Sequence, residues 1–151
     1  MPHEKQVAGS TGATPSERTH VRMESLKTAK DVVKFCEDRD VELIQLWFVD
    51  ILGQLKAVSI TRHELATALA EGAGIDGSSV EGFARIYESD LIAMPDVATF
   101  QLLPWKVNDE PVGRLICDVL NPDGSPYPGD PRGVLKRLVK RLDKQGMTAY
   151  L

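Results

Sequence analysis

Apolar residues recur every three or four positions between residues 25 and 39, and this spacing predicts a helix with one apolar side. That side consists of Leu26, Ala29, Val33 and Cys36, and is widened by Val32 and Phe35. Residues 41–51 (VELIQLWFVDI) are dense in branched and aromatic residues, which is typical of a strand that lies centrally in a sheet or is covered on both sides. A turn at Gly53 and Gln54 and the alternating residues 55–60 then predict the second strand of a hairpin.

A second helix is predicted where Thr61 and Glu64 have the T-x-x-E spacing of a capping box, ending at Gly72. Two strands are expected further on, at residues 98–105 (ATFQLLPW) and 112–120 (VGRLICDVL). A proline break is expected before the first of them, at Pro95, and Pro104 is expected to end it. Because the elements show no regular βαβ alternation, the expected fold is α+β, with a mainly antiparallel sheet and helices on one side.

The two ends of the chain differ from this middle part. Residues 1–22 contain only scattered apolar residues, so we expect a disordered tail. Near the other end, Asp130 and Pro131 are suited to the cap and first position of a helix that ends near Gly146. Its wide apolar side consists of Val134, Leu135, Leu138, Val139 and Leu142. Since such a side needs a partner surface, and residues 147–151 resemble the start of a strand, we expect a second domain whose remainder lies outside this sequence.

Composition narrows the class of protein. With 42% hydrophobic and 26% charged residues and no apolar stretch near the roughly 20 residues that span a bilayer, the chain is predicted to be a cytoplasmic globular protein without a membrane or secretion segment. A net charge of −4 and one short basic stretch at residues 136–141 argue against nucleic acid as a partner. Cys36 and Cys117 are expected to be buried reduced thiols, and the three dispersed histidines make no metal site.

The polar segment at residues 75–83 (IDGSSVEGF) has two interpretations. Asp76 followed by Gly77 is typical of a tight turn, because aspartate bonds its own downstream amides and glycine accepts positive φ. Alternatively, the glycines between residues 72 and 82 make a mobile segment that presents a carboxylate, as in a lid that closes over a polar or cationic ligand. The residues alone leave both interpretations open.

Three sequence blocks carry a family resemblance: DGSS with EGF-x-R-I, then ESD-x-x-x-x-PD, then D-x-x-NPDG with GDPR. Together they resemble the N-terminal domain of type I glutamine synthetases, most closely the form of Gram-positive bacteria and archaea, over residues 23–151. The resemblance implies a β-grasp domain at residues 23–122, with the sheet and its helix at about 38–122. Residues 123–151 are then a linker and the start of a catalytic domain.

The resemblance also implies an activity. Enzymes of this family use ATP and Mg²⁺ or Mn²⁺ to join ammonium to glutamate through γ-glutamyl phosphate. Their metal ligands, ATP site and glutamate site lie on the larger domain, so no metal ligand is expected in this chain and the 151 residues alone are predicted to be inactive. The small domain is expected to complete the active site of a neighbouring subunit in a ring, for which a dodecamer is the expected size.

Site residues follow from the matched motifs. Asp76 matches the aspartate that binds ammonium and draws off a proton, and a carboxylate in a closing, water-poor site attracts a small cation strongly. Ser79 matches a serine that helps to close the site, while Gly77 and Ser78 are expected to shape the turn.

Two further residues have competing interpretations. Arg85 matches an arginine associated with feedback inhibition by glutamine, although it equally suits an ordinary surface ion pair. Asp90 matches an aspartate near the subunit interface, although capping or turn formation would explain it as well.

Two other functions remain open at this point. In the first alternative, the complete protein is a related ligase that couples glutamate to a polyamine or another amine. The presence of Asp76 favours ammonia as the substrate. The chain can also be a non-catalytic interaction module that inserts into rings of a complete synthetase.

Overall fold

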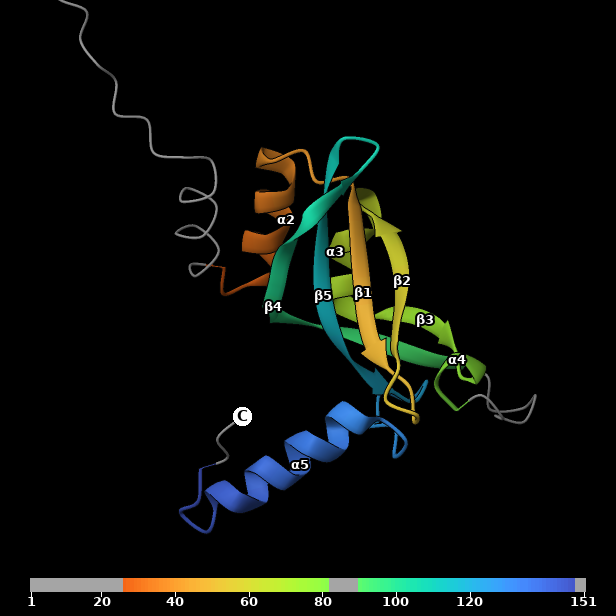
Figure 1. Ribbon diagram of the computed structural model, residues 1–151, viewed down its shortest axis with the longest axis vertical. Coiled ribbons are helices and arrows are strands. Elements are labelled where there is room, and N and C mark those ends of the chain that lie inside the picture. Colours follow the sequence, from red (N-terminus) through yellow and green to blue (C-terminus); the bar gives the residue numbers. More distant parts are fainter. Residues whose placement is uncertain (1–25, 82–89, 149–151) are drawn as a thin grey trace, which may run out of the picture.

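The computed structural model describes residues 26–81 and 90–148 (Figure 1). The predicted tail at residues 1–22, Arg85 and the last three residues therefore lie outside the described residues. The elements in chain order are α2 (Ala29–Asp38), β1 (Leu43–Val49), β2 (Leu55–Thr61), α3 (Arg62–Glu71), β3 (Ala73–Asp76), α4 (Ser78–Glu81), β4 (Asp90–Val107), β5 (Glu110–Leu120) and α5 (Pro131–Asp143).

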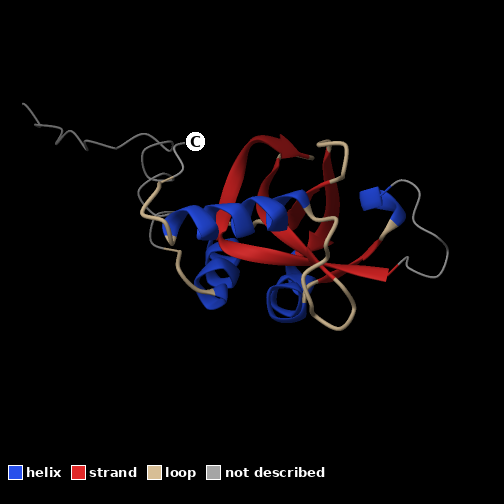
Figure 2. Cartoon of the chain, turned by 90° about the horizontal axis from the view of Figure 1, so that it is seen from below, coloured by secondary structure: helices blue, strands red, loops and turns tan. Residues whose placement is uncertain are grey.

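The strands form a five-stranded mixed sheet in the order β2-β1-β5-β4-β3. β1 is parallel to β5, and the other neighbouring strands are antiparallel. The sheet curls around α2 and α3, and α5 lies apart from them (Figures 1 and 2). This confirms the predicted α+β class and the hairpin of β1 and β2, and β1 lies inside the sheet between β2 and β5.

The core lies between the sheet and α2 and α3. Every second residue of β1 is buried, and these residues pack in one cluster with the buried side chains of the two helices. The cluster includes Ile44, Leu46 and Phe48 of β1, Val32, Phe35 and Cys36 of α2, and Leu65 and Ala68 of α3. Because each large aliphatic or aromatic side chain removed from water contributes about 1.5–3 kcal/mol, this cluster is the main source of stability.

The first helix differs from its prediction in start and orientation. It begins at Ala29 rather than Ser25, because Thr28 caps it: the Asp31 N–H donates to the Thr28 hydroxyl and the Thr28 N–H donates to the Asp31 carboxylate at 2.9 Å. Its buried side is centred on Val32, Phe35 and Cys36, whereas Leu26 and Val33 are only partly buried. The second helix confirms its predicted cap, since the Thr61 N–H donates to the Glu64 carboxylate at 2.8 Å.

The predicted proline breaks are wrong, because β4 continues through both Pro95 and Pro104. β3 pairs only with the first four residues of β4, so beyond Ala93 one side of β4 carries no strand of the described chain. A missing N–H is tolerated on such an edge. The pairing of β4 with β5 shifts register twice, after Asp96 and after Leu102, and such shifts let the strand bend where its pairing is irregular.

The first part of the glycine-rich segment after Gly72 has regular structure, and residues 82–89 lie outside the described residues. The chain forms β3 immediately and then the single helical turn α4, each held by one buried side chain, Ile75 and Val80. Gly72 makes this path possible, because it has φ 81° and a Cβ at its position would overlap the Ile92 side chain. The sequence did not indicate this role of Gly72, because the contact is with Ile92 on a neighbouring strand of the sheet.

The C-terminal helix was predicted correctly, with Asp130 as cap and Pro131 at its first turn. Its apolar side is exposed in the described part of the chain: Val134, Leu135 and Leu138 are between 45% and 50% exposed. No helix among residues 26–81 and 90–148 is long and apolar enough to cross a membrane.

An ion-pair network joins α5 to the sheet. The Arg132 guanidinium lies 2.7 Å from the Asp96 carboxylate and 2.5 Å from that of Asp118, and the Lys136 ammonium lies 2.6 Å from Asp118. Burial alone would raise the pKa of Asp96, but the hydrogen bonds from Arg132 and the Ala98 N–H outweigh it and lower that pKa.

We expect this network to make stability depend on acid pH. Because the pKa of Asp96 is lower in the folded chain, its contribution is present above the unfolded pKa of about 3.9 and is lost as the pH falls through the folded pKa. Urea unfolding of the Asp96→Asn variant should therefore lose less stability between about pH 6 and about pH 3 than the wild type does. An equal loss of unfolding free energy in the two proteins over this pH range would contradict the prediction.

Both cysteines are buried and free, in α2 and in β5, as predicted. Burial raises the pKa of the Cys36 thiol and that of the Cys117 thiol to about 12. Neither thiol is ionised near neutral pH, so neither is suited to nucleophilic or redox chemistry.

Candidate functional site

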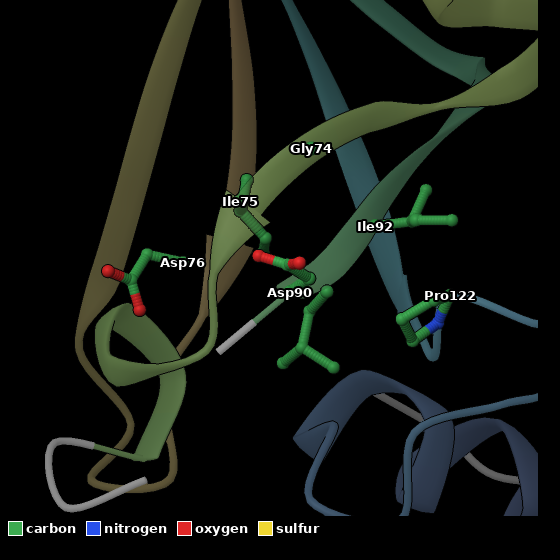
Figure 3. A pocket seen from close by; sticks show the side chains of 7 residues that line it. Gly74, Ile75, Asp76, Asp90, Ile92 and Pro122 are labelled. Carbon is green, nitrogen blue, oxygen red and sulfur yellow. The ribbon is translucent and has the colours of Figure 1, made fainter. Parts of the chain in front are cut away.

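The polar side chains predicted for the site gather at one end of the sheet. Asp76 is the last residue of β3 and pairs in register with Asp90, the first residue of β4. Both residues are exposed, and they lie at neighbouring ends of the two strands (Figure 3). Two like charges opposite each other are unfavourable in an antiparallel pair, so this end of the sheet favours a cation.

Asp76 forms the tight turn that its sequence predicts. The Ser78 N–H donates to the Asp76 Oδ1 at 2.9 Å. Hydrogen bonds from the backbone and then the hydroxyl of Ser78 lower the pKa of Asp76. The carboxylate is consequently anionic at neutral pH while its side chain stays exposed.

A shallow pocket of about 410 Å³ borders these two carboxylates (Figure 3). It is lined by Gly74, Ile75, Asp76, Asp90, Leu91, Ile92 and Pro122. The lining combines acidic groups at one side with apolar groups from β3, β4 and the segment after β5. Such a surface suits a small cation better than an anion, and it is open enough to be covered by another protein surface.

Ser79 is exposed on α4, immediately after the turn of Asp76. The turn is not free to move as a whole, because Gly77 is buried and Val80, only 1% exposed, packs in the core. The Val80 N–H also donates to the Gly77 carbonyl at 2.9 Å. The structure thus brings Asp76, Gly77, Ser78, Ser79 and Asp90 together, and the predicted roles of these residues stay predictions.

Asp90 begins β4, and this position tests neither of the roles considered for it, near a subunit interface or in a cap or turn. Sequence reasoning also missed Asp50, a buried carboxylate in the turn between β1 and β2 that approaches α4. An aspartate followed by Gly53 between two strands is a turn signal, but nothing local shows that this turn contacts the site.

Within the described part of the chain, no group of three or more histidine, cysteine, aspartate or glutamate side chains is arranged to hold a metal ion. The described residues therefore offer no such ligand set for a divalent metal ion.

Comparison with known proteins places these features in a family. The family model of the glutamine synthetase β-grasp domain matches residues 40–122. The chain is 48% identical over 122 residues to the glutamine synthetase of Mycolicibacterium smegmatis, covering 80% of this chain and 27% of that protein. It is 43% identical over 123 residues to that of Staphylococcus epidermidis, covering 82% of this chain and 28% of the relative.

Solved structures agree on the fold. A cryo-EM structure of Plasmodium falciparum glutamine synthetase matches 81% of this chain and 24% of that chain with a TM-score of 0.71, at 21% identity. A ligand-free structure of GmaS matches 77% of this chain and 27% of that chain with a TM-score of 0.69, at 28% identity.

The sheet curled around its helices and the match at residues 40–122 define a β-grasp domain of the glutamine synthetase type. The chain belongs to the glutamine synthetase family, as its sequence motifs predicted. It spans 27% of the length of its mycobacterial relative, so the activity of the whole protein is a matter of inference.

Proposed function

We propose that this chain is the N-terminal part of a cytoplasmic glutamine synthetase, which makes glutamine from glutamate, ammonium and ATP in nitrogen metabolism. In this proposal the chain contributes the Asp76 carboxylate, which forms part of the active site of the neighbouring subunit. The observation that carries this proposal is an anionic, exposed carboxylate on a turn whose two flanks are buried in the core.

The chemistry follows from the charge of Asp76. An anionic carboxylate attracts ammonium, and once water is excluded the attraction strengthens because the effective dielectric constant falls. Ammonium cannot act as a nucleophile until it loses a proton, and the proposal assigns the acceptance of this proton to Asp76. The ammonia that results attacks the γ-carbonyl carbon of γ-glutamyl phosphate and releases phosphate, giving glutamine. Ser79 supports closure over this site.

When bound to the complete protein, ATP and Mg²⁺ or Mn²⁺ would supply the phosphoryl group that activates the glutamate carboxylate. The described residues of this chain offer no metal-ligand set, so residues elsewhere in the protein would hold the metal. Arg85 is proposed to take part in feedback inhibition by glutamine, and Asp90 to lie near the interface with the neighbouring subunit.

We propose that the partner of this surface is a second subunit in a ring, with twelve subunits as the family-based expectation. Exposed apolar side chains lie on the turn beside the site: Leu52 is 78% exposed, and Ile51 and Leu55 are 50% and 55% exposed. Clusters of this kind mark interaction surfaces. The exposed apolar side of α5 supports a further contact, with the remainder of the protein.

Ammonium-dependent phosphate release by the complete protein that contains this sequence tests the proposal. We expect turnover that requires glutamate, ATP and ammonium, with ammonium preferred to putrescine and ethylamine by at least about 100-fold, because Asp76 suits a small cation. The 151-residue chain alone serves as the control and should release no phosphate. A preference for putrescine or ethylamine would support the amine-ligase alternative, and co-purification of an inactive chain with a complete synthetase would support the interaction module.

A further inference from the structure

We propose that Asp50 is a positioning residue for the ammonium site. Through the turn between β1 and β2, it holds α4 and with it the turn that carries Asp76. This inference rests on the proposed function, since it assigns Asp50 a role in the reaction through Asp76. Asp50 itself does not touch the reacting groups.

Asp50 organises the turn with one carboxylate oxygen. Its Oδ1 accepts the N–H of Leu52 at 2.9 Å and that of Gln54 at 2.8 Å. Its backbone closes the same turn, since the Asp50 N–H donates to the Gln54 carbonyl and the Gly53 N–H donates to the Asp50 carbonyl, each at 3.0 Å. The Asp50 side chain is only 6% exposed, so it is held against these amides although Leu52 itself is 78% exposed. The turn is therefore held in one shape.

That shape directs one backbone group toward the site. The Ile51 N–H, between Asp50 and Leu52, donates to the Val80 carbonyl of α4 at 3.1 Å. Val80 is connected back to the Asp76 turn, because its own N–H donates to the Gly77 carbonyl. Figure 3 shows the turn between β1 and β2 beside α4, with Asp76 at the end of β3. A change in the shape of the turn between β1 and β2 would thus displace α4, which supports the turn that carries Asp76.

The two oxygens of Asp50 can be separated by substitution. Oδ2 has an ion-pair partner, the Lys56 ammonium at 3.6 Å, but the turn amides donate to Oδ1. Asparagine at position 50 keeps an oxygen for both amides and loses the charge, whereas alanine loses the acceptor. Lys56→Met removes the ion pair and leaves the turn bonds in place, so it is the matched control.

The test measures steady-state kinetics of the complete enzyme. Asp50→Ala should raise the KM for ammonium roughly tenfold, because a small displacement of a reacting group is costly, while the KM for ATP stays within about twofold. Asp50→Asn and Lys56→Met should stay within about threefold of the wild type for ammonium. An unchanged KM for ammonium in Asp50→Ala, or equal losses for all substrates, would overturn the proposal.

The Asp76→Ala variant distinguishes a failure of the role proposed for Asp50 from a failure of the proposed function. If Asp76→Ala affects ammonium saturation and Asp50→Ala does not, the role of Asp50 is wrong and the proposed function stands. If neither variant affects it, the ammonium role of Asp76 fails, and the role of Asp50 fails with it.

A second variant covers the case in which Asp50→Ala does not assemble. Gly53 has φ 80°, and a methyl group added at its Cα would meet no atom within 4 Å, so Gly53→Ala strains the turn backbone without a clash and keeps the carboxylate. It should raise the KM for ammonium in the same direction. Gly124→Ala, at another open glycine with φ 80°, should not, and equal effects of the two would overturn the proposal.

Discussion

Replacing Asp76 with alanine is expected to lower kcat/KM for ammonium by about 100-fold or more in the complete enzyme. The substitution removes both the anion that attracts ammonium and the base that accepts its proton. Because Ser78 lowers the pKa of Asp76, the carboxylate is charged throughout the neutral range, and the loss should be similar between about pH 6.5 and about pH 8. Initial rates of phosphate release against ammonium concentration measure it.

Asp123 provides a control with the same local chemistry. It is exposed, its carboxylate accepts the Ser125 N–H at 2.9 Å, and hydrogen bonds from Ser125 lower its pKa. Asp123→Ala should leave the KM for ammonium within about twofold, because the Asp123 side chain is not among those that line the Asp76 pocket, although its neighbour Pro122 is. Equal effects of the two substitutions would show a general consequence of losing a surface turn and would remove the case for Asp76.

Replacing Asp130 with alanine is expected to destabilise the chain by about 2–4 kcal/mol. Asp130 is 2% exposed, and its carboxylate accepts three backbone N–H groups: those of Arg132 and Gly133 at 3.0 Å and that of Val119 at 3.2 Å. The first two belong to the start of α5 and the third to β5. The substitution therefore removes a helix cap and leaves a buried strand amide without its acceptor.

Urea unfolding measures this effect, with Thr28→Ala as the comparison. Thr28 is an exposed cap on α2, so its loss should cost only about 1 kcal/mol. Asp130→Asn should fall between wild type and alanine, because one oxygen can still accept the two bonds that Oδ2 receives from Val119 and Gly133. A cost of Asp130→Ala no larger than that of Thr28→Ala would show that the link to β5 contributes nothing.

Asp130 and Asp50 have related structural roles. Each is a nearly buried carboxylate that accepts backbone N–H groups and thereby fixes the shape of the backbone around it. Asp130 attaches α5 to β5, and Asp50 shapes the turn that contacts α4. Rigid attachment of this kind suits a domain whose proposed role is to present one carboxylate to another subunit.

Features that depend on neighbouring residues were predictable from the amino-acid order. The capping box of Thr61 and Glu64, the cap at Asp130, and the turn formed by Asp76 each involve bonds that reach no more than four residues along the chain. The alternation of β1 and its hairpin with β2 follow from the same local periodicity. The family motifs, which are also short segments, predicted the β-grasp domain from the sequence.

Features that depend on pairing across the sheet were not predictable in this way. β4 passes through Pro95 because its second neighbour ends at Ala93, and β3 exists because Gly72 lets the chain approach Ile92. The same applies to the placement of Asp76 opposite Asp90 and to the bond from Ile51 to Val80. Each of these contacts joins residues that are distant along the chain, and their geometry is set by the packed core rather than by local conformational preference.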